Sequence, residues 1–352
     1  MKTDKIRVGI THGDVNGIGY EIIIKTLMDM KIIDMCTPIV YGSPKVAAYH
    51  RKALNITNFS FNNIKNPDEA NPKRANIINC IDDSVRVELG KSTSIAGTNS
   101  YTALEAAMKD LKDNKIDVLV TAPINKKNIQ SKDFHFPGHT EYLNAHYPED
   151  ESLMIMVSDS IKIAVVTGHI PLNTVSENLT SEKILNKLRI LNDTLVKDFT
   201  NRKPKIAVLA LNPHAGDDGI LGTEEKEVIL PAIETAQKEN IMAFGPFPAD
   251  GFFGSNQFKN FDAILAMYHD QGLIPFKALS FDEGINYTAG LPIIRTSPAH
   301  GTAYELAGQN IASPVSFRNA LYWAIDIFKS RKLHTQLNKN PLPSYDINEM
   351  EN

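Results

Sequence analysis

Short apolar runs alternate with longer stretches of helical periodicity along this chain. The apolar runs are almost uninterrupted, which favours strands that are buried on both faces of a parallel or mixed sheet. We predict seven strands, at residues 6–10, 38–41, 116–120, 153–157, 163–167, 206–211 and 263–267.

Three stretches between these runs have the spacing of an amphipathic helix. Residues 101–114 and 181–199 each place their apolar side chains in one stripe, and Ser181 is a candidate N-cap for the second. Residues 223–240 also predict a helix, which Pro231 should kink or restart. Strands that alternate with helices predict an α/β fold. Residues 50–95 are too polar to assign, and the polar tail from 337 to 352 is expected to be loosely held.

Composition narrows the class of protein. The chain has 352 residues, of which 42% are hydrophobic and 22% are charged, and its net charge is −4. These values are typical of a globular protein of two domains, and the lack of a Lys/Arg-rich run argues against a nucleic-acid partner. Cys36 and Cys80 form no CxxC pair. We find neither a signal peptide nor an apolar run of membrane-spanning length, so we expect a cytoplasmic protein with no membrane partner.

Two familiar nucleotide-binding patterns are missing. The stretch ELGKST resembles the end of a P-loop, but that motif needs a glycine where this chain has Val85. The GxGxxG fingerprint is also absent. A nucleotide would therefore have to bind in another way.

Three of the apolar runs end at a histidine. IAVVTGH, IAVLALNPH and AILAMYHD lead to His169, His214 and His269. Ligands of open α/β sheets bind beyond the carboxyl ends of the strands, where these histidines are expected. Neutral imidazoles suit divalent metals such as Zn²⁺ and Co²⁺, and three of them leave positions open for a substrate. The pattern predicts a three-histidine metal site; the alternative is three unrelated structural histidines.

Two other stretches offer ligands for an anion. VLVTAPINKKNI ends a predicted strand at Thr121 and then supplies Lys126 and Lys127, while FHFPGHTEYL places His139 and Thr140 after a Pro-Gly turn. A hydroxyl beside an imidazole suits a phosphate or a carboxylate. The alternative is an N-cap threonine and a surface histidine.

A third set of polar residues follows His269. Asp270, Lys277, Asn286 and Arg295 lie in a stretch of low charge density with several glycines. Lys, Arg and an amide donor can bind a substrate with several negative charges. We expect a glycine-rich loop that forms a binding site, the alternative being solvated surface.

Taken together, these stretches resemble the 4-hydroxythreonine-4-phosphate dehydrogenases of pyridoxal phosphate biosynthesis. The matching blocks extend from residue 9 to about 308, and NPHAG…GTEE and AMYHDQG are the most specific. The first block departs from the family. Where the family has MGDPAGIGPE, this chain has HGDVNGIGYE, with changes at His12, Val15, Asn16 and Tyr20.

The resemblance implies the isocitrate/isopropylmalate dehydrogenase type of fold, which binds its nicotinamide cofactor without GxGxxG. We therefore expect a two-domain α/β/α protein with the active-site cleft between its domains. Residues 1–125 and 290–352 would form one domain with the cofactor-side loop. Residues 126–289 would form the other, with metal and substrate residues and the dimer interface.

The resemblance also assigns roles to residues. It implies NAD beside His300, Gly301 and Thr302, and one divalent metal (Zn, Mg or Co) per site on His169, His214 and His269. It implies a homodimer whose active sites are shared between subunits. It does not decide between NAD and NADP. The implied substrate contacts are His139, Thr140, Lys277, Asn286 and Arg295.

The implied reaction is oxidation of 4-phosphooxy-L-threonine at C3, followed by decarboxylation to 3-amino-2-oxopropyl phosphate. A general base is required, and Asp250, Asp270 and Lys277 are unranked candidates. One alternative is a sister dehydrogenase of a threonate or erythronate 4-phosphate. A more remote alternative is a metal-dependent hydrolase, which would need no nicotinamide loop.

Overall fold

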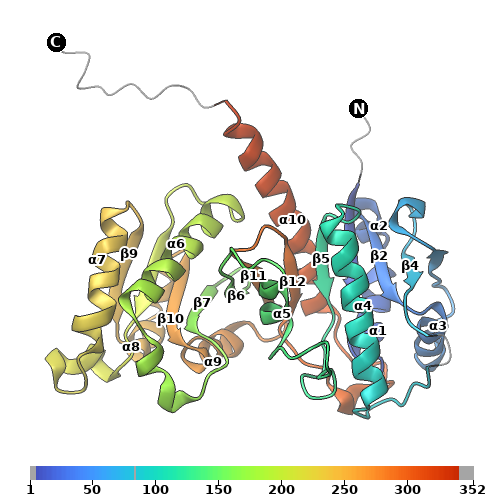
Figure 1. Cartoon of the computed structure of the whole chain (residues 1–352), viewed down its shortest axis with the longest axis horizontal. Helices are drawn as coiled ribbons and strands as arrows, with labels where there is room; N and C mark the ends of the chain where they lie inside the picture. The colour runs from blue at the N-terminus through green and yellow to red at the C-terminus, as the bar shows by residue number, and fades with distance from the viewer. Residues whose placement is uncertain (1–4, 83–84, 341–352) are drawn as a thin grey trace.

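A single mixed sheet of twelve strands forms the centre of the molecule in the computed structural model, which describes residues 5–82 and 85–340 (Figure 1). The strand order is β3-β4-β2-β1-β5-β12-β11-β6-β7-β10-β8-β9. All seven predicted strands are present, as β1 (Ile6–Thr11), β2 (Cys36–Gly42), β5 (Val118–Thr121), β6 (Leu153–Val157), β7 (Lys162–Thr167), β8 (Lys205–Leu209) and β10 (Ala263–Tyr268). The strands that we did not predict are β3 (Asn62–Ile64), β4 (Asn76–Asn79), β9 (Met242–Phe247), β11 (Ile285–Ala289) and β12 (Arg295–Pro298).

The helices confirm the α/β prediction. They are α1 (Gly19–Leu27), α2 (Met30–Met35), α3 (Pro44–Ala53), α4 (Ser94–Lys112), α5 (His139–Ala145), α6 (Ser181–Lys197), α7 (Leu230–Lys238), α8 (Ala249–Gly254), α9 (His269–Ser280) and α10 (Val315–Leu337).

Two details of the predicted helices can be compared with the structure. Thr180, not Ser181, is the N-cap of α6, because the hydroxyl of Thr180 accepts the N–H of Lys183. A turn of π-helix leads into α7, whose first turn contains Pro231, so the proline restarts the helix as predicted. The predicted loose tail falls largely on residues 341–352, outside the described residues.

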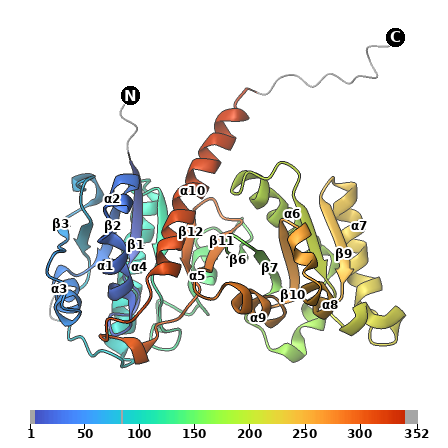
Figure 2. The same ribbon diagram turned by 180° about the vertical axis from the view of Figure 1, so that it is seen from behind.

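Two blocks of parallel strands make up the sheet. In the first, β3, β4, β2, β1, β5 and β12 are parallel neighbours, and in the second β7, β10, β8 and β9 are. The antiparallel strands β11 and β6 join the blocks, so the two blocks run in opposite directions. Figures 1 and 2 show the blocks at opposite ends of the molecule, with α5, β6, β11 and β12 between them. Our two-domain boundaries stay a prediction.

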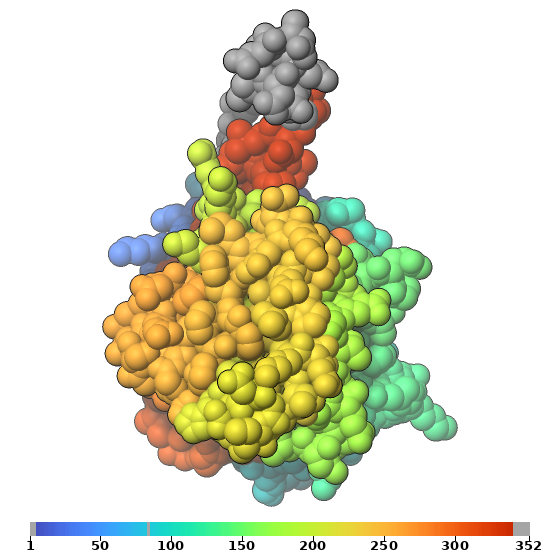
Figure 3. All heavy atoms as spheres, turned by 90° about the vertical axis from the view of Figure 1, so that its left-hand side faces the viewer, coloured from blue at the N-terminus to red at the C-terminus, as the bar shows by residue number. Residues whose placement is uncertain are grey.

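The two faces of the sheet are covered differently. Helices α1, α2, α3, α6, α7 and α10 contribute to one large apolar cluster on the first face. The second face carries two separate apolar clusters, one beneath α4 and α5 and one beneath α8 and α9. The sheet is therefore the middle layer of an α/β/α sandwich, and the second face has a gap between its two clusters. Seen from the β9 end of the sheet in Figure 3, α10 extends beyond the body of the molecule.

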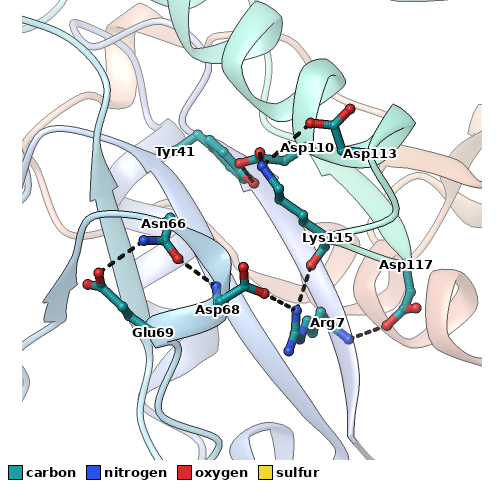
Figure 4. A network of polar contacts seen from close by, with 9 residues as sticks. All are labelled: Arg7, Tyr41, Asn66, Asp68, Glu69, Asp110, Asp113, Lys115 and Asp117. Carbon is teal, nitrogen blue, oxygen red and sulfur yellow. Dashed lines mark hydrogen bonds and ion pairs between the residues drawn. The ribbon is translucent and has the colours of Figure 1, made fainter.

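A polar network connects β1 to residues that we could not assign from sequence (Figure 4). Arg7 donates its backbone N–H to Asp117, at 2.7 Å, and its guanidinium donates to Asp68, at 3.2 Å. Asp68 lies in a short 3₁₀ turn between β3 and β4. Nearby, Tyr41 of β2 donates to Asp110 of α4, at 2.8 Å. These contacts tie the strand pair β3–β4 to the rest of the first block.

The unusual first block of the sequence forms a buried stack of rings. His12 stacks on Tyr20 with 5.2 Å between ring centroids, and Tyr20 stacks on His50 at 5.1 Å. Both imidazoles are buried, and neither nitrogen of His12 has a hydrogen-bond partner. Burial lowers the pKa of each histidine from 6.5 to about 4. Two of the departures from the family pattern, His12 and Tyr20, therefore pack against each other.

This stack predicts a loss of stability in mild acid. Between pH 6.5 and 4 the unfolded chain protonates both rings, whereas the folded chain keeps them neutral. Each ring then removes up to about 1.4 kcal/mol of stability per pH unit as the pH falls through this range. In His12→Gln the free energy of unfolding should depend less steeply on pH, as measured by urea denaturation at several pH values. Equal slopes for the variant and the wild type would contradict this account.

Candidate active site

A cleft of about 270 Å³ occupies the gap between the two apolar clusters. Its floor consists of the strands β6, β11 and β12. Side chains alternate between the two faces of a strand, and cross-strand partners share a face. The pairs Met156–Asn286 and Asn286–Ser297 therefore place three floor residues on the cleft side. Met154 and Arg295 also line the floor.

The walls of the cleft come from segments far apart in the sequence. On one side lie Thr121, at the end of β5, Lys126, in the segment after β5, and the start of α5. On the other side lie His169, after β7, and residues of α9. The loop after β12 completes the lining with His300 and Gly301. The lining thus includes these nine residues that we predicted for the site: His139, Thr140, His169, His269, Lys277, Asn286, Arg295, His300 and Gly301.

The guanidinium of Arg295 dominates the electrostatics of the floor. The residue is only 3% exposed. Its Nε and Nη2 donate to the Thr121 hydroxyl, at 3.0 and 2.6 Å, and its Nη1 donates to the Thr288 hydroxyl, at 3.2 Å. Among the described residues it forms no ion pair with a carboxylate. Burial lowers its pKa to about 9, and nearby Glu141 opposes this shift. A buried cation held only by hydroxyls is costly, so an anionic ligand would stabilise it.

Several polar atoms of the lining lack partners. His139 Nε2, Glu141 Oε2, Asn286 Oδ1 and His300 Nε2 are buried and have no hydrogen bond within the described chain. His139 is neutral because burial, and then the charges of Arg295 and Lys126, lower its pKa well below 6.5. Buried polar atoms are normally satisfied, so this group of atoms marks a place for a polar ligand.

One histidine of the cleft is held between two charged side chains. His169 Nδ1 lies 3.1 Å from Glu141 Oε1, and its Nε2 lies 3.2 Å from the Lys126 ammonium. The ring of His269 lies close by, with 5.5 Å between the two centroids. Two imidazoles of one chain therefore face the same cleft.

The third predicted metal ligand lies elsewhere. His214 is exposed and does not line this cleft. It begins a run of six residues with positive φ, from 214 to 219, of which only Gly216 and Gly219 are glycines. Such backbone is strained for other residues, and strain of this kind often occurs at functional sites. The buried carboxylate of Glu225 supports the start of this loop by accepting the N–H groups of Leu211 and Asn212, at 2.9 and 2.7 Å.

A divalent metal fits the donors of this cleft only in part. His169 and His269 are suitable ligands, and Glu141 can orient His169. Among the described residues, no group of three His, Cys, Asp or Glu side chains could hold a metal within one chain. The three-histidine metal site therefore stays a prediction. One chain supplies two of the three histidines, His169 and His269, to the cleft.

Three other predicted residues lie outside the lining. Asp250 is exposed at the start of α8, and Asp270 is paired with His269 Nδ1, at 2.6 Å. Thr302 accepts the N–H of Ile18 through its carbonyl oxygen, at 3.1 Å. It packs against the first loop, where a Cβ on Gly17 would lie 2.8 Å from its carbonyl oxygen.

The structure corrects two local expectations and adds residues. Asn286 lies in β11 and Arg295 begins β12, so neither belongs to a glycine-rich loop. Gly290 lies in the turn between these two strands. Thr140 is not an N-cap, since α5 begins at His139 after Gly138. We had given no role to Glu141, Met154, Met156 or Ser297. The alternation in INYTA was the signal for β11.

A family model described as "Pyridoxal phosphate biosynthetic protein PdxA" matches residues 34–324. The chain belongs to the PdxA family. A protein of Bacteroides thetaiotaomicron named 4-hydroxythreonine-4-phosphate dehydrogenase is 52% identical over 344 residues, which are 97% of this chain and 94% of the relative. A protein of Oceanobacillus iheyensis, provisionally named D-threonate 4-phosphate dehydrogenase, is 37% identical over 91% of this chain and 97% of its own length.

Solved structures agree with membership of the PdxA family. A 4-hydroxythreonine-4-phosphate dehydrogenase from Klebsiella pneumoniae has a TM-score of 0.79 and 32% identity, covering 93% of this chain and 98% of its own. An isocitrate dehydrogenase from Methylococcus capsulatus, at 13% identity and a TM-score of 0.51, shares the fold alone; it covers 95% of this chain and 89% of its own. These matches confirm the predicted family and fold class. No helix in residues 5–82 and 85–340 is long and apolar enough to cross a membrane.

Proposed function

We propose that this PdxA protein oxidises 4-phosphooxy-L-threonine at C3 with NAD⁺ and that the resulting β-keto acid loses CO₂ to give 3-amino-2-oxopropyl phosphate. One observation carries the proposal. The same cleft gathers the cations Arg295 and Lys277, two histidines and the loop of His300 and Gly301. The two cations suit a substrate with two anionic groups, and the loop of His300 and Gly301 suits a nicotinamide cofactor.

The binding residues explain how the substrate would be oriented. Arg295 is buried in the floor and Lys277 extends from α9, so the two cations come from different sides of the cleft. A phosphate and a carboxylate on the same substrate can then be held at two points. His139, Thr140 and Asn286 add polar atoms near these cations. Binding at several points fixes C3 in one orientation, which lowers the entropic part of the barrier.

NAD and the divalent metal would be held by different residues of this site. NAD would lie beside His300, Gly301 and Thr302, and a divalent metal (Zn, Mg or Co) would be held by His169 and His269 with one further histidine. When bound, NAD⁺ supplies a hydride acceptor, and the metal supplies a Lewis acid for the oxygen at C3.

A general base must accept the proton of the C3 hydroxyl as the hydride leaves. Of the three candidates, Lys277 alone lines the cleft in the described chain. We therefore assign this role to Lys277, whose ammonium form would attract an anion and whose neutral amine form would accept the proton. Asp250 and Asp270 remain candidates only if a second subunit brings them to the site.

We infer that the enzyme is a cytoplasmic homodimer in which each active site is shared. The support is the position of His214, which is exposed on a strained loop outside the cleft of its own chain. Exposed apolar residues follow it, since Ile220 is 79% exposed and Leu221 is 45% exposed. A loop of this kind can enter the cleft of a second copy, where His214 of the partner subunit would join His169 and His269.

The alternative function is that of a sister dehydrogenase of a threonate or erythronate 4-phosphate. The relative provisionally named D-threonate 4-phosphate dehydrogenase supports this alternative. Such an enzyme would use the same anion-binding residues with a substrate that has no amino group. A metal-dependent hydrolase is a more remote alternative and would not need NAD.

A substrate panel tests the proposed function. With NAD⁺, 4-phosphooxy-L-threonine should give an absorbance increase at 340 nm, and D-threonate and D-erythronate 4-phosphate should react much more slowly. Chelation should abolish turnover, and adding back Zn²⁺, Co²⁺ or Mg²⁺ should restore it. His214→Ala should leave a folded protein with little bound metal. A preference for threonate 4-phosphate would contradict the proposed substrate. Turnover that persists after chelation would contradict the proposed metal dependence.

Arg295→Ala and Lys277→Ala test the anion contacts. Each substitution removes a charge-assisted hydrogen bond of about 1.5–3 kcal/mol, so kcat/KM should fall by roughly ten- to a hundredfold or more. The affinity for NAD⁺, measured by calorimetry, should change little. If NAD⁺ binding is lost while substrate affinity is unchanged, these cations serve the cofactor instead.

Mixed dimers test whether the site is shared. If the partner supplies His214, dimers of His214→Ala and Arg295→Ala chains have one site with both changes and one intact site. Random pairing makes half of the dimers mixed, so activity should return to about a quarter of the wild-type value. His169→Ala with Arg295→Ala is the matched control, and it should not recover because both residues line the same cleft. If subunits exchange and no pair that includes His214→Ala recovers, the shared site is wrong.

A further inference from the structure

We propose that Glu141 is a positioning residue that holds the ring of His169 with its proton on Nδ1 and the lone pair of Nε2 toward the cleft. The proposal rests on the proposed role of His169 as a metal ligand. It adds a residue for which the sequence predicted no role.

The two neighbours of His169 require the same tautomer. A carboxylate can only accept a hydrogen bond, so the ring nitrogen beside Glu141 Oε1, at 3.1 Å, must carry the proton. An ammonium group can only donate, so the nitrogen beside Lys126 Nζ, at 3.2 Å, must present its lone pair. Both contacts therefore place the proton on Nδ1.

Glu141 is the only carboxylate among the residues that line the cleft. No second acid competes for His169 there.

The backbone fixes the position of this carboxylate. Glu141 lies in the first turn of α5, and the next residue, Tyr142, anchors the helix by donating to Glu105 of α4 and by stacking on Phe134. Gly138 leaves room beside the carboxylate, since a Cβ there would lie 3.3 Å from Glu141 Oε2. Residues of α4 and α5 thus hold an acid against a histidine that follows β7.

The contact with Lys126 indicates where a metal would bind. The Lys126 ammonium is a cation that faces the Nε2 lone pair, which is the atom that a metal would need. A divalent ion on His169 must therefore displace Lys126, while Glu141 keeps the ring in place. Metal-binding histidines commonly donate their other ring N–H to a carboxylate, and loss of that partner weakens metal binding by about 10- to 100-fold.

The tautomer can be measured without any metal. In full-length protein labelled with ¹⁵N-histidine, at about pH 8 where a free imidazole is neutral, His169 of the wild type should show a single Nδ1-protonated tautomer. Because the Lys126 ammonium also favours this tautomer, the comparison is made in Lys126→Met protein, which should keep the Nδ1-protonated tautomer through Glu141 alone. Adding Glu141→Ala to Lys126→Met should then give a mixture of tautomers. Adding Glu141→Gln instead should keep the single tautomer because its amide oxygen can still accept the hydrogen bond from Nδ1–H. Glu105→Gln, on the helix that anchors α5, is the matched control and should leave His169 unchanged.

Co²⁺ titration, followed by the visible absorption of the ion, supplies the second measurement. Glu141→Ala should bind Co²⁺ about 10- to 100-fold more weakly than wild type, and Glu141→Gln should lie between them. An unchanged tautomer when Glu141→Ala is added to Lys126→Met overturns the proposal, as does an equal change in Glu105→Gln, which would indicate displacement of α5. If the tautomer shifts as expected but wild-type protein binds no Co²⁺, Glu141 positions His169 and the proposed metal site is wrong.

Discussion

The alternation of side chains along three central strands is the constraint on which the site depends. In β6, β11 and β12 one face carries apolar residues such as Ile155, Ile285 and Tyr287, which pack beneath α6 and α10. The opposite face carries Asn286 and Arg295, which line the cleft. A continuous core and a polar cleft therefore share the same short strands. The separation requires strands, because a helix would spread these positions around its circumference.

The core side of these strands is itself held by a buried polar network. Arg331 of α10 donates through Nε to Asp198, at 2.6 Å, and through Nη2 to the hydroxyl of Tyr287, at 2.8 Å. Its Nη1 donates to the carbonyl groups of residues 291–293, in the turn that precedes Arg295. The last helix thus contacts both β11 and the turn that leads to Arg295. A second arginine, on the core side of the sheet, therefore supports the segment that carries the buried cation of the cleft.

Sequence patterns predicted seven strands, among them β6 of the cleft floor, and missed β3, β4 and β9 near the edges of the sheet and the floor strands β11 and β12. Long apolar runs identify strands that are buried on both faces, as in the seven that were found. In β11 and β12 every second residue faces the cleft and is polar, so the apolar run is interrupted at Asn286 and Arg295. The candidate residues could nevertheless be recognised, because charges are rare in that segment. The separation of His214 from His169 could not be predicted, since it depends on the strand order, in which β10 lies between β7 and β8. Glu141 was overlooked for a similar reason, as its partner lies 28 positions along the chain.

The continuous sheet also restricts how the protein can move. In many two-domain enzymes a flexible linker acts as a hinge, and closure rotates one rigid body against the other. Here the parts on either side of the cleft are connected by the hydrogen-bonded ladder of β12, β11, β6 and β7. A hinge rotation at this place would have to break or bend that ladder. Any opening or closing of the cleft is therefore restricted to twisting of the sheet and to segments outside this ladder, such as the stretch from Lys126 to α5 that lines the cleft.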